Sequence, residues 1–145
     1  SRMAALEAGE GGEEGGRRVR QRVGAAPHDA PPSNAAVRAM DVAAAAAVLH
    51  VSVSRVSVAA CNRLANLCIE VQNRQLAAEA GAIEAIVAAM QVHPQVAGVQ
   101  QRGCMALGNV CCGDDAAGRA RKQRVADAGA IEAVAAAMQA HPQVA

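Results

Sequence analysis

The chain has 145 residues, the length of about one domain, and its 14 basic and 13 acidic side chains leave a formal charge of +1. This near-neutral balance argues against a nucleic-acid binder built on one broad basic face. Hydrophobic residues make up 52% of the chain, yet it contains no Phe, Tyr or Trp, so its core must consist of Ala, Val, Leu, Ile, Met and Cys in thin layers.

An N-terminal tail of residues 1–33 is set apart by its composition. It contains five glycines between positions 9 and 16 and prolines at positions 27, 31 and 32, a composition typical of disordered segments. Four arginines between Arg17 and Arg22 form a basic cluster in this tail. Two interpretations of the cluster stay open, a nuclear-import or anionic-surface signal and a solvated charge run.

The folded region is expected to begin near Asn34, a residue type that caps helices. Residues 35–49 form an Ala-rich run of high helix propensity, so we predict a helix there, a diverged copy of the helix that recurs later in the chain. The longest uncharged apolar stretch, residues 42–54, is shorter than the roughly 18 to 20 residues that a membrane-spanning helix needs. We therefore expect no membrane insertion.

A long amphipathic helix is predicted twice. The segment Cys104-Met-Ala-Leu-Gly-Asn-Val-Cys111 has the helical period, with small and apolar residues gathered around Leu107. It aligns with Cys61-Asn-Arg-Leu-Ala-Asn-Leu-Cys68, 43 residues earlier. Residues 51–58 alternate in a way that would fit a strand, but the alignment favours a helix for this copy as well.

The clearest internal repeat is residues 81–97, which return as residues 129–145 with 14 of 17 positions identical at a spacing of 48. The two predicted long helices are 43 residues apart, whereas the two copies of residues 81–97 are 48 residues apart. Five residues are therefore inserted after the second long helix, within residues 113–118, which we predict to be a loop. A short charged helix is expected before each copy, over residues 73–80 and about residues 120–128. The glycine that opens each copy suits the left-handed turn that ends a helix.

Each copy of this repeat carries a one-sided apolar stripe at helical spacing, so its helix must pack on a neighbour. A His-Pro pair at positions 93–94 ends the first of these helices. The repeating unit is thus a short helix, a helix and a long helix, as in stacked arrays whose units bury their apolar faces on one another. The stripe residues are Ile83, Ile86, Val87 and Met90 in the first copy and Ile131, Val134, Ala135 and Met138 in the second.

The last unit stops before its long helix. We expect the chain to be a fragment of a longer array, with about two and a half repeats at residues 34–80, 81–128 and 129–145. The last stripe then has no following unit to pack on, which brings a risk of self-association.

The order of the three helices, the glycine between the first and the second, and Cys104-Met-Ala-Leu-Gly-Asn-Val110 in the third resemble an armadillo repeat. The resemblance covers residues 34–145 and is closest to diverged cytosolic arrays, such as vacuolar armadillo proteins and the armadillo region of leucine-rich-repeat kinases. It implies an all-α fold, a right-handed α-solenoid of three-helix repeats whose third helices line a concave groove. It also implies a protein-binding scaffold.

In importin-like and catenin-like members of the family, a tryptophan and an asparagine four residues later on the third helix bind extended peptides. The asparagine positions match Asn66 and Asn109, whereas the tryptophan positions hold Asn62 and Met105. Without the aromatic cation–π platform, recognition of nuclear-localisation signals in the importin manner is not expected.

The candidate partner-binding residues lie on the face of the long helices opposite the core stripe. Amides on this face can pair with the backbone of an extended peptide, and arginines can pair with carboxylates. For the two asparagines that both copies share, a structural alternative stays open, in which they bond to a neighbouring repeat. The candidate residues are Arg55, Asn62, Asn66, Arg102, Met105 and Asn109.

Catalysis, cofactors and metal ions are not expected. The paired cysteines of each long helix stand seven residues apart, about two turns, which is too far to share one zinc ion and favours core packing. His93 and His141 recur because the repeat recurs, which favours a role in the turn over general-base catalysis. Five cysteines and the lack of a secretory leader favour a reducing compartment, the cytoplasm, with the nucleus as the second candidate.

A second basic cluster, within residues 119–124, follows Asp114 and Asp115. The pattern favours a solvated short helix, with an acidic partner or an RNA backbone as the alternative. The sequence as a whole predicts a non-catalytic scaffold that binds a peptide or helical segment of another protein. The alternative is a structural or targeting array of a larger signalling protein such as a kinase, with the catalytic domain outside these residues.

Overall fold

The computed structural model describes residues 30–142, and every regular element in that part of the chain is an α-helix. The predicted all-α fold class is therefore confirmed. The arginine cluster of the predicted tail lies outside the described residues, as does nearly all of the tail itself. In chain order the helices are α2 (Asn34–Arg38), α3 (Val42–Val48), α4 (Ser54–Leu67), α5 (Val71–Glu79), α6 (Ala82–Val92), α7 (Ala97–Val110), α8 (Ala116–Asp127) and α9 (Ala130–Ala140).

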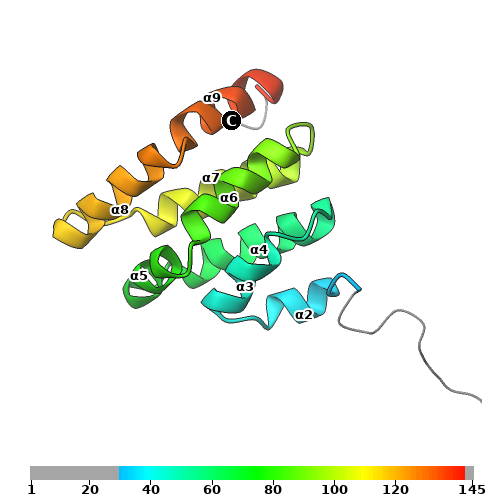
Figure 1. Cartoon of the computed structure of the whole chain (residues 1–145), viewed down its shortest axis with the longest axis horizontal. Coiled ribbons are helices and arrows are strands. Elements are labelled where there is room, and N and C mark those ends of the chain that lie inside the picture. The colour runs from blue at the N-terminus through cyan, green and yellow to red at the C-terminus, as the bar shows by residue number, and fades with distance from the viewer. Residues whose placement is uncertain (1–29, 143–145) are drawn as a thin grey trace, which may run out of the picture. The chain divides into compact units, whose positions relative to one another are not determined.

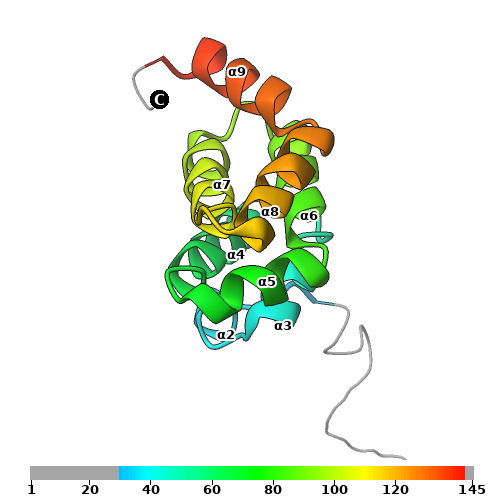
Figure 2. The ribbon, with the colours of Figure 1, turned by 90° about the vertical axis from the view of Figure 1, so that its left-hand side faces the viewer.

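The helices form successive layers. The first layer contains α2, α3 and α4, the second contains α5, α6 and α7, and the third contains α8 and α9 (Figure 1). Helix α4 packs along α7, α3 lies against α6, α6 lies against α9, and α5 lies against α8. These helices thus meet their counterparts in the next layer, which gives the repeat-like arrangement that the sequence spacing predicts. Figure 2 shows α9 beyond α6 and α7, at the opposite end of the stack from α2 and α3.

The prediction of a single helix over residues 35–49 is wrong, because this stretch forms two short helices, α2 and α3. Ser33, and not Asn34, caps α2, since the Ser33 hydroxyl accepts a hydrogen bond from the Ala36 N–H at 3.1 Å. The Asp41 carboxylate accepts a hydrogen bond from the Ala44 N–H at 2.9 Å. Asp41 therefore starts a second helix within the Ala-rich run, because its short side chain can satisfy an N–H at the new helix end.

The inserted residues are more helical than predicted. Helix α8 begins at Ala116 instead of about residue 120, because the Asp115 carboxylate caps it by accepting a hydrogen bond from the Gly118 N–H at 2.8 Å. A side chain at Gly118 would collide with the carbonyl of Gly113, so this helix start requires glycine. Part of the insertion thus lengthens α8 to 12 residues, against 9 in α5, which itself begins at Val71.

The remaining elements confirm the sequence interpretation. Residues 54–67 are helical although part of this stretch alternates like a strand. Gly81 and Gly129, at the starts of α6 and α9, have φ angles of 79° and 87° in the left-handed region that glycine tolerates best. The His93-Pro94 pair follows the end of α6 at Val92, and α7 begins at Ala97.

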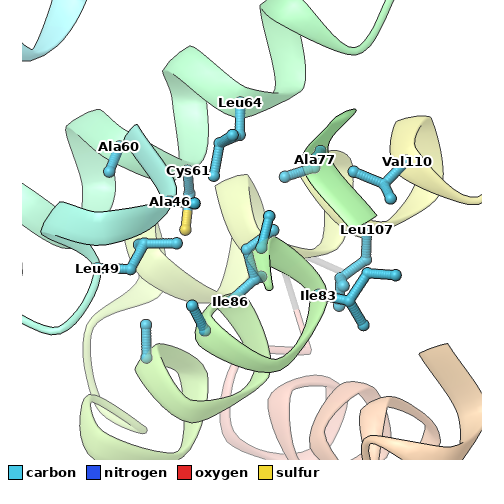
Figure 3. Close-up of a cluster of buried hydrophobic side chains, with 14 of the residues drawn as sticks. Ala46, Leu49, Ala60, Cys61, Leu64, Ala77, Ile83, Ile86, Leu107 and Val110 are labelled. Atoms are coloured by element: carbon cyan, nitrogen blue, oxygen red, sulfur yellow. The ribbon is translucent and has the colours of Figure 1, made fainter. Parts of the chain in front are cut away.

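The core is assembled from small and aliphatic side chains. Leu64, Ile83 and Ile86 are fully buried, and Cys61 lies among them at the contact between layers (Figure 3). Helices α6 and α7 approach closely, since a Cβ atom at Gly103 would lie 2.9 Å from Cγ and Sδ of Met90. Close packing of this kind replaces the large contact areas that aromatic residues would supply.

The apolar stripe is buried in α6 and exposed in α9. Ile83 is 0% exposed, whereas Ile131, the same position 48 residues later, is 65% exposed. The buried residues of α9 are instead the alanines Ala130, Ala133 and Ala137. The last layer is therefore covered on one side and open on the other.

The two equivalent isoleucines make a matched pair for a stability measurement. Ile83→Ala should lower the free energy of unfolding by about 2–5 kcal/mol, because it leaves a cavity in a packed core. Ile131→Ala should change it by no more than about 0.5 kcal/mol, because an exposed side chain leaves no cavity. Urea unfolding followed by circular dichroism measures both values, and equal losses would contradict the difference in burial.

Candidate functional site

The six candidate residues lie on two neighbouring long helices. Helix α4 carries Arg55, Asn62 and Asn66, and α7 carries the other three, and the two helices pack side by side. Arg55, Asn66 and Met105 are exposed, whereas the others are half-buried. The predicted residues are thus brought to adjacent helices, but their individual contacts differ.

Asn109 forms a link between layers. Its Nδ2 donates a hydrogen bond to the carbonyl oxygen of Ala65 at 2.7 Å, across the contact of α7 with α4. This bond matches the structural alternative that the sequence left open for the shared asparagines. Asn66 occupies the same position one repeat earlier, and within residues 30–142 its side chain is exposed and makes no hydrogen bond. The two asparagines therefore differ in availability.

Arg55 is also engaged within the protein. Its Nη1 donates to the carbonyl oxygen of Pro32 at 2.8 Å and to Oδ1 of Asn34 at 3.0 Å, so it fastens the start of α2 to α4. Arg102 lies with Nη1 at 3.7 Å from the sulfur of Met105, a weak contact. Among residues 30–142, Asn62 and Asn66 are thus the candidate amides without such ties, Asn66 being exposed and Asn62 half-buried.

Met105 opens onto an apolar groove between α7 and α9 that the sequence did not single out. The groove has a volume of about 400 Å³ and opens to the surface. Its most exposed apolar side chains are Met105 and Met138, at 44% and 53%. The lining residues are Gln100, Gln101, Cys104, Met105, Val134, Ala137, Met138 and His141. The exposed stripe of the last repeat was the sequence signal for this surface.

The second basic cluster is a solvated helix face except at one residue, since Arg119, Lys122 and Arg124 are exposed but Arg121 is buried at 6% exposure. Its guanidinium donates to the carbonyl oxygens of Val110 and Cys112 at 2.8 and 3.0 Å, and to Oε1 of Gln75 at 3.0 Å. The last carbonyls of a helix have no partner within it, and a cation there also meets the negative end of the helix dipole. Arg121 therefore caps α7 from the following layer.

The same capping device appears one layer earlier. Arg74 in α5 donates from Nε to the carbonyl oxygen of Cys68 at 2.9 Å and from Nη2 to that of Ile69 at 3.1 Å. Asn73 beside it donates to the carbonyl oxygen of Leu67 at 2.8 Å. The end of each long helix is thus satisfied by the first helix of the next layer, which ties the layers together.

Arg124, in the same cluster, pairs with a carboxylate. Its Nε and Nη2 donate to the two carboxylate oxygens of Glu84 at 2.9 and 3.2 Å, which joins α8 to α6. Hydrogen bonding from Arg124 lowers the pKa of the Glu84 carboxyl group, so the pair adds stability above the ordinary Glu pKa and loses it as the pH falls through the lowered one. Because both side chains are half exposed, the pair contributes at most about 1 kcal/mol.

The two cysteines of α4 and its C-terminal end, Cys61 and Cys68, are buried core residues, whereas Cys104 and Cys111 are half-buried. Burial raises the pKa of the Cys61 thiol to about 12 and that of Cys68 to about 11, so both thiols stay protonated at neutral pH. Cys112 is exposed. His141 lies with Nε2 at 3.0 Å from the carbonyl oxygen of Pro94, a contact between the turns of successive repeats.

Over residues 30–142, no group of three or more His, Cys, Asp or Glu side chains is placed to hold a metal ion. None of the described helices has the length and hydropathy to cross a membrane. Comparison of the chain with protein-family models, with curated proteins and with solved structures finds no match. The surface chemistry is therefore the basis for a functional proposal.

The buried arginine can be compared with an exposed neighbour in the same helix. Arg121→Ala should lower the free energy of unfolding by about 1.5–3 kcal/mol, because it leaves carbonyls at the end of α7 without their charged donor. Lys122→Ala should cost no more than about 1 kcal/mol, since its pair with Asp114, at 3.3 Å, is exposed to solvent. Thermal unfolding of the two variants tests the difference, and a cost for Arg121 no larger than that for Lys122 would show that the cap is unimportant.

Proposed function

We propose that the chain is a non-catalytic protein-binding scaffold of the armadillo type. The observation that carries the proposal is the side-by-side packing of two equivalent long helices, with the amide of Asn66 exposed and that of Asn62 half-buried on α4. A rigid polar helix edge of this kind suits recognition of another polypeptide better than it suits chemistry.

Several features support an armadillo-type array as the architecture. The full layers follow the order of short helix, helix and long helix, and a glycine with positive φ separates α5 from α6 and α8 from α9. Each long helix is capped by the first helix of the next layer. The match of helix to counterpart between layers is what a solenoid of three-helix repeats requires.

The proposed contacts centre on Asn62 and Asn66, with Arg102 and Met105 on the neighbouring helix. An amide offers both a donor and an acceptor to the backbone of an extended or helical segment, and the Arg102 guanidinium can pair with a carboxylate. Arg55 and Asn109 belong to the scaffold in this proposal, because their hydrogen bonds hold α2 and α7 against α4.

The absence of catalysis is part of the proposal and rests on the state of the reactive groups. A thiol with a pKa of about 12, as at Cys61, is a poor nucleophile at neutral pH. His141 is committed to a backbone carbonyl at a turn. All five cysteines are free thiols, which supports a location in a reducing compartment, the cytoplasm or the nucleus.

The second proposal for the same fold is a structural or targeting array within a larger signalling protein such as a kinase. It rests on the same stacking of layers, with the spacing of attached domains as the function. The two proposals differ in whether the outward-facing amides of α4 matter for binding.

The amides provide the test. The double variant Asn62→Ala, Asn66→Ala should weaken retention of partner proteins about 5- to 30-fold, because each lost pairing leaves a polar group of the partner unsatisfied. Quantitative affinity capture from a cytosolic extract measures retention, and circular dichroism should show unchanged helix content. Gln72→Ala, which removes an exposed amide from α5, is the matched control. Equal retention by all three proteins would rule out the proposed surface and favour the spacer.

A further inference from the structure

The groove between α7 and α9 is the counterpart of a site that the protein itself fills one repeat earlier. Its α7 residue Cys104 corresponds to Cys61 in α4, 43 positions before it. Its α9 residues Val134, Met138 and His141 correspond to Ile86, Met90 and His93 in α6, 48 positions before them. In the earlier repeat, α4 and α6 together hold α7. The groove therefore continues the interface of α7 with α4 and α6 by one further layer.

The contacts of α7 in the earlier site indicate what the groove would accept. Val58 of α4 lies 3.2 Å from the position that a Cβ of Gly98 would take. Ile86 and Met90 of α6 pack against Gly103, where a Cβ would come within 2.9 Å of Met90. A helix that fits between such walls needs a small residue at the closest approach.

A hydrogen bond fixes the same helix at its N-terminal end. Pro94 has no N–H, so the carbonyl of Met90, four residues earlier, lacks its helical partner. The buried Gln100 supplies one, since its Nε2 donates to the carbonyl oxygens of Met90 and His93 at 2.9 Å each. In α9 the same arrangement recurs with Met138 and Pro142, four residues apart. The carbonyl of Met138 therefore calls for an amide donor from outside α9.

We propose that this groove binds an amphipathic α-helix of a partner protein with the chemistry of α7. The bound helix carries an amide at the position of Gln100, glycine or alanine three residues later at the position of Gly103, and an apolar residue at the position of Leu107. The amide donates to the Met138 carbonyl, and the small residue lets the helix lie against Val134 and Met138. This site goes beyond the proposed α4 surface, because of the residues proposed there only Met105 lies in the groove.

The probe for the groove is a peptide of residues 97–111 with a fluorophore at its N-terminus, kept under reducing conditions. Fluorescence anisotropy with the full chain should show saturable binding. Replacing Gln100 of the peptide by alanine, or its Gly103 by leucine, should weaken binding by at least about tenfold, because each change removes a feature on which the fit depends.

Two variants of the full chain test whether the peptide binds in the groove. Met138→Asp in the groove should weaken binding at least about tenfold, whereas Ile131→Asp in the same helix but outside the groove should leave it unchanged. Both side chains are more than half exposed, so neither change is expected to unfold the protein. Binding that is absent, or that is insensitive to Met138→Asp, would overturn the proposal.

Sedimentation velocity separates a partner helix from a second copy of the chain. A dimer that Met138→Asp abolishes, and that the peptide does not displace, would overturn the proposal in favour of self-association through the groove. A monomer that binds the peptide supports it. The double variant Asn62→Ala, Asn66→Ala should leave peptide binding unchanged. That variant therefore tests the proposed α4 surface alone, whereas Met138→Asp tests the groove.

Discussion

Close approach of α4 to α7 is the constraint on which the rest of the structure depends. The described core contains no aromatic residue, so contact area must come from short side chains on helices that lie very near one another. Glycine at position 98 permits that approach, and glycine at position 103 permits a similar approach of α6 to α7. The alanines, Leu64 and Ile86 fill the space between layers. Within residues 30–142 no further helix packs on the outer side of α9, so Ile131 and Met138 are exposed while their counterparts in α6 are buried. The scaffold and its open groove thus have one physical origin.

Polar side chains determine the register in which neighbouring layers pack. Arg74 and Arg121 each reach back to the last carbonyls of a long helix, Gln100 satisfies the carbonyl that Pro94 leaves without a partner, and Asn109 bonds across to α4. Each of these side chains donates to a backbone carbonyl near a helix end, where the helix that contains the carbonyl offers it no N–H partner. The packing of short apolar side chains permits neighbouring registers, whereas hydrogen bonds to particular carbonyls specify one. The polar groups that remain on the outside of α4 are then the ones available to a partner.

The sequence predicts the helices well where the apolar period and the internal repeat agree, as they do for α4, α6 and α7. It fails where a single polar side chain overrides local propensity. Asp41 divides an Ala-rich run by capping a new helix, and Arg121 is buried although its neighbours are charged, because its partners are backbone carbonyls that no residue pattern reveals. The candidate surface shows the same limit. The internal repeat makes Asn66 and Asn109 equivalent in sequence. However, the hydrogen bond from Asn109 to the Ala65 carbonyl, 44 residues away, depends on the neighbouring layer. Neither the second wall of the groove nor its volume could be obtained without the packing of α9 on α7.

The most direct measurement of this account is native-state hydrogen exchange resolved by helix. If each layer is stabilised by its neighbours, amides in α4, α6 and α7 should exchange only through global unfolding, whereas those of α9, which buries three alanines, should exchange through local opening at a lower free energy. Protection in α9 equal to that in α7 would contradict the account, because it would mean that the last helix derives its stability from something other than a neighbouring layer.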